Sequence, residues 1–77
     1  MKEFVEYIAK SIVDNPDQVV VEDKVVEDKK LVLALRVHQS DIGKVIGKQG
    51  KTAQAIRTLL QAIAAKDGKR AILEIVD

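Results

Sequence analysis

The stretch VIGKQGKTAQAI, residues 45–56, sets two glycines three positions apart between two apolar segments. A glycine adopts positive φ at little cost and lets another backbone approach closely, because it has no Cβ atom. Gly47 and Gly50 therefore predict a tight turn between two helices. The second helix begins just after Gly50, so its unpaired N–H groups and positive dipole end point toward the turn, where Lys48 and Lys51 add charge. An anion is the expected ligand, although a plain turn between helices would have the same two glycines.

Outward from this turn, the periodicity of apolar and β-branched residues predicts six elements. Helices are expected over residues 2–14, 40–46 and 51–65, and strands over 18–26, 31–38 and 70–76. The first two strands form a hairpin, and the last two are linked through two helices, which favours a parallel pair with a right-handed crossover. The predicted fold is α+β, in the order helix-strand-strand-helix-helix-strand, with a mixed three-stranded sheet and helices packed on one face.

The same periodicity assigns single side chains to the core or to caps. Inward positions are expected at Ala53, Ile56, Leu60 and Ile63 of the long helix and at Leu31, Leu33, Leu35 and Val37 of the second strand. Arg36 and His38 lie on the other face of that strand. Ser40 is the expected N-cap of the short helix, Asp41 favours the positive end of its dipole, and Gly47 ends it.

The composition limits the classes of protein to which the chain can belong. With 77 residues, 47% of them hydrophobic and 32% charged, it is expected to form one folded domain over residues 1–77. The absence of cysteine excludes disulfides and thiolate metal sites. The N-terminal segment lacks the apolar run of a signal peptide or a membrane span, so we expect a cytoplasmic protein.

Charge is divided unevenly along the chain. Residues 1–30 hold five Lys against eight Asp and Glu, whereas residues 31–77 hold eight Lys and Arg against four Asp and Glu. Between residues 44 and 70, Asp67 is the single acid among seven basic residues. Such a concentration indicates a local site for a polyanion, and a solvated helix face would look the same.

Nucleotide binding and catalysis fit the sequence poorly. Gly50-Lys51-Thr52 repeats the end of a nucleotide-binding P-loop, but Val45 stands where the first glycine belongs and a helix precedes the motif. His38 is the only histidine. Because neither Ser11 nor Ser40 lies on a recognisable nucleophile turn, we expect no enzyme.

The acidic pairs and the aromatic residues indicate neither a metal site nor a stacking platform. Glu22-Asp23 and Glu27-Asp28 lie in the predicted hairpin, where they are interpreted as solvated protection of a sheet edge, so no metal and no cofactor is expected. Phe4 and Tyr7 are the only aromatic residues, and both belong to the first helix. Base stacking of the kind found in other RNA-binding folds is therefore not expected.

The run Ile46-Gly47-Lys48-Gln49-Gly50, followed by apolar Ile56 and Leu59, resembles the I-G-x-x-G core of KH domains. The helix and strand that precede the core resemble the type II arrangement of that fold, and the small size resembles the KhpA family of bacterial RNA-binding proteins. The resemblance implies binding of short single-stranded RNA, in post-transcriptional regulation or as an RNA chaperone. In KH domains the glycine loop clamps about four backbone nucleotides, and bases rest in an apolar groove.

The resemblance also implies a set of contact residues. The clamp would be Gly47, Lys48, Gln49 and Gly50; the helical wall Ile42, Val45, Ile46 and Ala53; the rim Lys44, Lys51, Gln54 and Arg57; and the opposing strand Arg36 and Val37. For Ile42, Val45 and Ile46 the alternative is ordinary core packing, which we expect for at least one of them.

Partners follow from the same resemblance. Single-stranded RNA is the expected ligand, and a homodimer and a larger partner with a KH domain, of the KhpB (Jag) type, are further implications. No membrane and no small-molecule substrate is expected. The alternative from another class is a protein-protein interaction module on a KH scaffold, which would dock a partner through the first helix with Phe4 and Tyr7.

Overall fold

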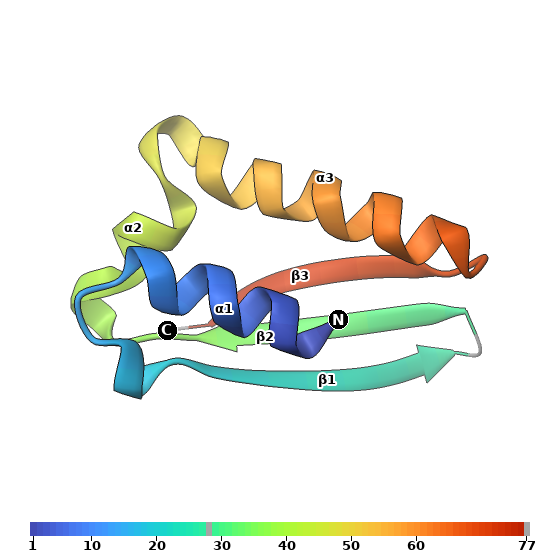
Figure 1. Cartoon of the computed structure of the whole chain (residues 1–77), viewed down its shortest axis with the longest axis horizontal. Helices are drawn as coiled ribbons and strands as arrows, with labels where there is room; N and C mark the ends of the chain where they lie inside the picture. Colours follow the sequence, from blue (N-terminus) through green and yellow to red (C-terminus); the bar gives the residue numbers. More distant parts are fainter. Residues whose placement is uncertain (28, 77) are drawn as a thin grey trace.

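Helices and strands follow one another in the predicted order in the computed structural model, which describes residues 1–27 and 29–76 (Figure 1). The helices and strands are α1 (Lys2–Ile12), β1 (Val20–Glu27), β2 (Lys30–Arg36), α2 (Ile42–Ile46), α3 (Lys51–Lys66) and β3 (Arg70–Val76). Short 3₁₀ turns lie between them at η1 (Pro16–Gln18), η2 (Gln39–Asp41) and η3 (Lys48–Gly50).

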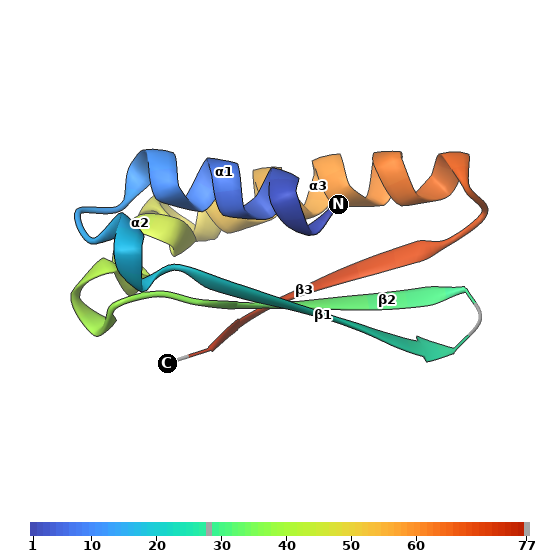
Figure 2. The same ribbon diagram turned by 60° about the horizontal axis from the view of Figure 1, so that its bottom comes forward.

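The strands form one mixed sheet in the order β1-β2-β3. β1 pairs antiparallel with β2, and β2 pairs parallel with β3, so that Leu33 lies opposite Leu73. The crossover between the parallel strands passes through α2 and α3, as the length of a parallel connection requires. Figure 2 shows all three helices on one face of the sheet. The predicted α+β fold is confirmed.

The core lies between the sheet and the helices. Its fully or nearly fully buried side chains include Val5 and Ala9 of α1, Leu33 and Leu35 of β2, Leu60 of α3 and Leu73 of β3. Burial of each leucine contributes about 1.5–3 kcal/mol to folding. The alternation predicted for the second strand is confirmed, because Leu33, Leu35 and Val37 are buried while Arg36 and His38 are exposed.

One residue of α3 does not face the core as expected. Ile63 is 39% exposed, and the inward position one residue later is taken by Ala64, which is 1% exposed. The buried residues Ala53, Ile56, Leu60 and Ala64 follow spacings of three, four and four. A helix of 3.6 residues per turn keeps that series on one face and rotates Ile63 to its side.

The acidic residues of β1 lie on an edge of the sheet. Glu22 and Asp23 are exposed there, where unpaired backbone groups would otherwise offer a template for another strand. Their role as edge protection stays a prediction. Asp28 lies outside the described residues, and the side chain of Glu27 is not described.

The connection from α1 to β1 is longer than the sequence predicts. α1 ends at Ile12 instead of residue 14, and β1 begins at Val20 instead of residue 18. Pro16 occupies the start of the intervening η1 turn. Its fixed φ suits the first position of a turn, and it disfavours helical geometry in Asn15, so the helix does not continue through this segment.

The cap expected before α2 is different from the one observed. Ser40 is not the cap; instead its backbone N–H donates to Nδ1 of His38 at 3.1 Å, which caps the η2 turn. Asp41 holds the N-cap position of α2 but makes no side-chain cap bond there. Its carboxylate accepts hydrogen bonds from the backbone N–H of Asp14 at 3.3 Å and of Asn15 at 3.0 Å, and from Asn15 Nδ2 at 3.0 Å.

Asp41 is thus a buried tether between the α1–β1 connection and the start of α2, with 0% of its surface exposed. Burial alone would raise the pKa of this carboxyl group, but the hydrogen bonds from Asn15 and from the backbone of Asp14 outweigh burial. With the positive charge of Lys44 they lower its pKa below the ordinary value. The carboxylate therefore stays ionised in the folded protein.

The turn after α2 depends on a glycine. Gly47 has φ 78° and ψ 174°, a region that residues with a side chain hardly enter. A Cβ atom at this position would lie 2.8 Å from the backbone nitrogen of Thr52 and would overlap its side chain. Gly47 therefore ends α2 as expected and lets the start of α3 pack directly against the turn.

We expect Gly47→Ala to destabilise the protein by about 2 kcal/mol or more, since it adds backbone strain to a steric overlap. Gly43→Ala in α2 is the matched control, because a Cβ atom there meets nothing within 4 Å and alanine favours the helix. Urea unfolding of both variants tests this. Equal stability of the two variants would show that the turn relaxes around a side chain.

We expect Asp41→Asn to lower the Tm at neutral pH by several degrees, because the new amide group faces the donors of Asp14 and Asn15. The lowered pKa of Asp41 stabilises the fold above the pKa of the unfolded chain, about 4, and this contribution is lost as the pH falls through the folded-state pKa.

Thermal unfolding followed by circular dichroism over this pH range is the measurement for Asp41. The Asn variant should lose less stability on acidification than the parent protein does. Asp17→Asn serves as the control, because Asp17 is an exposed carboxylate. Parallel acid curves for all three proteins would contradict the role assigned to Asp41.

Candidate functional site

The GKQG turn, defined as Gly47 to Gly50, is a tight loop in which three of the four residues have positive φ. Positive φ angles occur at Gly47 (78°), Gln49 (59°) and Gly50 (75°). The N–H of Gly50 donates to the carbonyl of Gly47 at 3.1 Å, which closes the loop upon itself. The chain thus passes from α2 to α3 in the smallest space that the two glycines allow.

Gln49 is the strained member of the GKQG turn. It is the only residue with a side chain that has positive φ in the described part of the chain. The left-handed conformation costs a residue with a Cβ atom about 1–2 kcal/mol. Such strain persists where the surrounding structure enforces it, and it is concentrated at ligand clamps and active sites.

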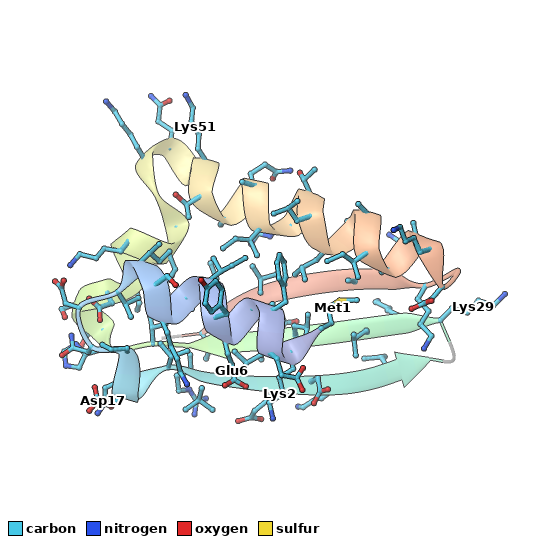
Figure 3. All side chains as sticks on the ribbon, in the orientation of Figure 1. Met1, Lys2, Glu6, Asp17, Lys29 and Lys51 are labelled. Carbon is cyan, nitrogen blue, oxygen red and sulfur yellow. The ribbon has the colours of Figure 1, made fainter. Side chains whose placement is uncertain are left out.

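The tip of the turn presents positive charge to solvent. Lys48, Gln49 and Lys51 are all exposed, and Figure 3 shows Lys51 pointing away from the body of the molecule beside the turn. Among the backbone hydrogen bonds of the described residues at the turn, those of Gly47 and Gly50 are present and none is donated by Lys48 or Gln49. Exposed lysines beside such amide groups suit an anion of extended shape, such as a backbone phosphate.

Lys44 is engaged by two carboxylates, unlike the exposed lysines of the turn. Its ammonium group donates a hydrogen bond to Oδ2 of Asp14 and lies 3.8 Å from Oδ1 of Asp41. The hydrogen bond to Asp14 raises the pKa of Lys44, partial burial opposes this, and the negative charges of Asp14 and Asp41 raise it further. Lys44 therefore stays protonated. The carboxylates of Asp14 and Asp41 compensate its positive charge.

The other predicted rim residues lie on the outer surface of α3. Gln54 and Arg57 are exposed and follow Lys51 at intervals of three, so they continue from the turn along one side of the helix. Gln61 lies on the same side and donates from Nε2 to the carbonyl of Ala71 at 2.6 Å. This side of α3 therefore lies next to β3.

The apolar wall is smaller than the sequence suggests. Val45 and Ala53 are 0% and 2% exposed, so both belong to the core and offer no surface to a ligand. The expectation that they line the wall is corrected, and Val45 matches the alternative of ordinary core packing. Ile46 is 38% exposed and Ile42 is partly buried, so the accessible wall consists of these two residues.

Arg36 is the last residue of β2, and Val37 follows it. β2 is the central strand of the sheet, so its neighbours flank it on both edges. Val37 is 5% exposed and packs in the core beneath the helices. Arg36 alternates with it and therefore lies on the opposite, helix-free face. The expectation that these two residues oppose the helical wall stays a prediction.

The structure also brings together residues that the sequence analysis did not connect. Asp14 and Lys44 are 30 residues apart, and Asn15 and Asp41 are 26 residues apart. Nothing in the local pattern of either segment indicates the other, since the contact arises only when α2 folds back beside the end of α1. Asp67, the single acid between residues 44 and 70, lies at the C-cap of α3.

Several other kinds of site are not found in the described residues. They form no cluster of three or more His, Asp or Glu side chains suited to a metal ion. Residues 1–27 and 29–76 also enclose no detectable pocket. Within the same ranges, no helix combines the length and the hydrophobicity needed to cross a membrane. The candidate site is a surface around the GKQG turn.

Comparison with known proteins identifies the family. Residues 2–75 match the model of the KH domain of KhpA/KhpB. RNA-binding protein KhpA of Clostridium perfringens is 50% identical over 76 residues, which cover 99% of this chain and 100% of the relative. RNA-binding protein KhpA of Caldanaerobacter subterraneus subsp. tengcongensis is 51% identical with the same coverage.

A third relative has a similar identity. RNA-binding protein KhpA of Aquifex aeolicus is 49% identical over 77 residues, which cover 100% of this chain and 96% of the relative. No solved structure matches the chain. The family match over nearly the whole chain agrees with the I-G-x-x-G core and with the observed order of helices and strands, and the chain therefore belongs to the KhpA/KhpB family of KH domains.

Proposed function

We propose that this protein binds short single-stranded RNA, with the GKQG turn holding the sugar-phosphate backbone. The observation that carries the proposal is the turn itself, in which two glycines of positive φ flank the exposed residues Lys48 and Gln49, with exposed Lys51 next in the chain. The family and the relatives named RNA-binding proteins support it. Reading of single-stranded RNA by KH domains rests on such a glycine loop.

The proposed mode of binding is a backbone clamp with shallow base contacts. Lys48 and Lys51 neutralise phosphates, while Gln54 and Arg57 extend the polar surface along α3. Ile46, which is 38% exposed, offers apolar surface to a base beside the turn. Phe4 and Tyr7, the only aromatic residues, belong to α1, so no stacking contribution of about 1–3 kcal/mol per base is available at the turn. One module therefore binds weakly.

Because one KH domain binds RNA weakly, two paired KH domains are expected to bind the same RNA more tightly than one. Two linked modules bind one RNA with an affinity raised by effective concentration, without any new contact. We therefore include in the proposal a homodimer, or a pair with a KH protein of the KhpB (Jag) type, acting in post-transcriptional regulation or as an RNA chaperone. The proposal takes residues 1–77 as one KH domain that acts in the cytoplasm, without catalysis.

Docking of a protein is the second candidate function, and exposed apolar residues on the helices favour it. Tyr7 of α1 is 73% exposed, and Leu59 and Ile63 of α3 are 49% and 39% exposed. α1 and α3 lie on the same face of the sheet (Figure 2). A protein partner seated there would perturb residues 2–14, whereas RNA at the turn would perturb residues 44–57, which NMR chemical shifts distinguish.

We expect Lys48→Asp combined with Gln49→Asp to weaken binding of a mixed-sequence single-stranded RNA at least tenfold. Both glycines remain, and aspartate tolerates positive φ better than most residues, so the turn keeps its shape while repelling phosphate. Fluorescence anisotropy measures the affinity, and circular dichroism checks the fold.

The matched control for the turn carries the same change of charge elsewhere. Ala65→Asp with Lys66→Asp alters two exposed residues at the far end of α3. That end lies about 20 Å from the turn along the helix, beyond the Debye length of about 8 Å in physiological salt. Equal loss of affinity in both double variants, or none in either, would contradict the clamp and favour the protein-docking function.

Binding should also depend on salt in a defined way. If about three phosphates are neutralised at the turn and along α3, the slope of log affinity against log salt concentration is about −2 for a single strand. Anisotropy titrations over a series of salt concentrations give this slope. A slope of zero would show that phosphate contacts do not drive the binding.

A further inference from the structure

Among the described residues, Lys44 is the only basic residue near the GKQG turn with a carboxylate partner. It lies in α2, three residues before Gly47. Lys44 is thus one of the rim residues that the KH resemblance assigns to the site, but its ammonium group already has an anionic ligand.

That ligand is the carboxylate of Asp14, and Asp41 holds Asp14 in place. The buried carboxylate of Asp41 accepts the backbone N–H groups of Asp14 and Asn15, which fixes this segment against the start of α2. From there Oδ2 of Asp14 contacts the ammonium group of Lys44. The contact between Asp14 and Lys44 is therefore supported by the backbone hydrogen bonds to Asp41, which place the backbone of Asp14 beside α2.

The two carboxylates around Lys44 differ in whether a ligand can replace them. The side chain of Asp41 is 1% exposed and stays within the fold. The side chains of Asp14 and Lys44 are 76% and 42% exposed, so water and salt reach this pair. Exposed ion pairs are weak and screened by salt, which means that a phosphate group can compete with Asp14 for the ammonium group.

We propose that Asp14 sets the RNA affinity of this surface by occupying Lys44 in place of a backbone phosphate. This inference rests on the proposed function, because it assumes an RNA strand at the GKQG turn. In the parent protein Lys48 and Lys51 bind phosphate directly, whereas Lys44 binds it only after Asp14 is displaced. The carboxylate of Asp14 acts as an internal competitor of the phosphate group, and Asp41 is the positioning residue that keeps it there.

The experiment compares Asp14→Asn with Asp17→Asn in anisotropy titrations with the same single-stranded RNA. Asparagine has nearly the shape of aspartate and keeps the backbone N–H that binds Asp41. Asp17 is an exposed acid three residues further on that makes no ion pair with the described residues. Both variants change the net charge equally, so their difference isolates the contact with Lys44.

We expect Asp14→Asn to bind RNA about two- to fivefold more tightly, which is the range of affinity that the loss of an exposed ion pair releases. The salt slope should steepen by about 0.7, the value for one more phosphate on a single strand. Asp17→Asn should leave both quantities nearly unchanged. In a Lys44→Gln background, Asp14→Asn should bring no gain, which links the effect to Lys44.

Three outcomes would overturn the inference, and they differ from failure of the proposed function. Equal gains for Asp14→Asn and Asp17→Asn would mean that only overall charge matters. A persistent gain in the Lys44→Gln background would assign it to another group, and weaker binding by Asp14→Asn would show that Asp14 presents Lys44 to RNA. Absence of RNA binding by the parent protein and by every variant would overturn the proposed function together with the inference.

Discussion

The structure around the site depends on the backbone at Gly47, where φ is 78° and ψ is 174°. No side chain fits there, because Thr52 at the start of α3 closes the space that a Cβ atom would need. This close approach limits α2 to five residues and starts α3 directly after the turn. Gln49 in the same turn has a left-handed conformation, which costs about 1–2 kcal/mol. A preorganised backbone loses less entropy when a ligand binds.

A second constraint lies at the other end of α2, where Asp41 is buried with its carboxylate ionised. Unpaired, such a group would destabilise the fold, but three hydrogen bonds from Asp14 and Asn15 satisfy it. The result is a connection between the α1–β1 segment and α2. The acidic N-terminal half and the basic C-terminal half of the chain therefore meet at the rim of the site, where Lys44 lies between Asp14 and Asp41. The charge of the candidate surface is set partly by residues outside the KH core motif.

Much of the fold and part of the site follow from local patterns in the chain. Residues such as Leu33, Leu35 and Leu60 reveal their buried face through a period of two or 3.6, which depends only on neighbours along the sequence. The glycine spacing predicts the turn for the same reason. Predictions of which apolar residues remain accessible were less accurate, because they depend on how neighbouring helices and strands pack. Val45 and Ala53 are apolar and adjacent to the motif, but α3 and the sheet cover them.

The sequence by itself therefore determined the order of elements, the mixed sheet, the GKQG turn and the family to which its motif belongs, because each is encoded in short-range spacing. Only the tertiary structure decided which apolar residues remain accessible, that Arg36 lies on the face without helices, and that Asp14 reaches Lys44 across 30 residues of chain. Such contacts depend on how the elements pack, and packing brings together segments whose separate patterns carry no information about each other.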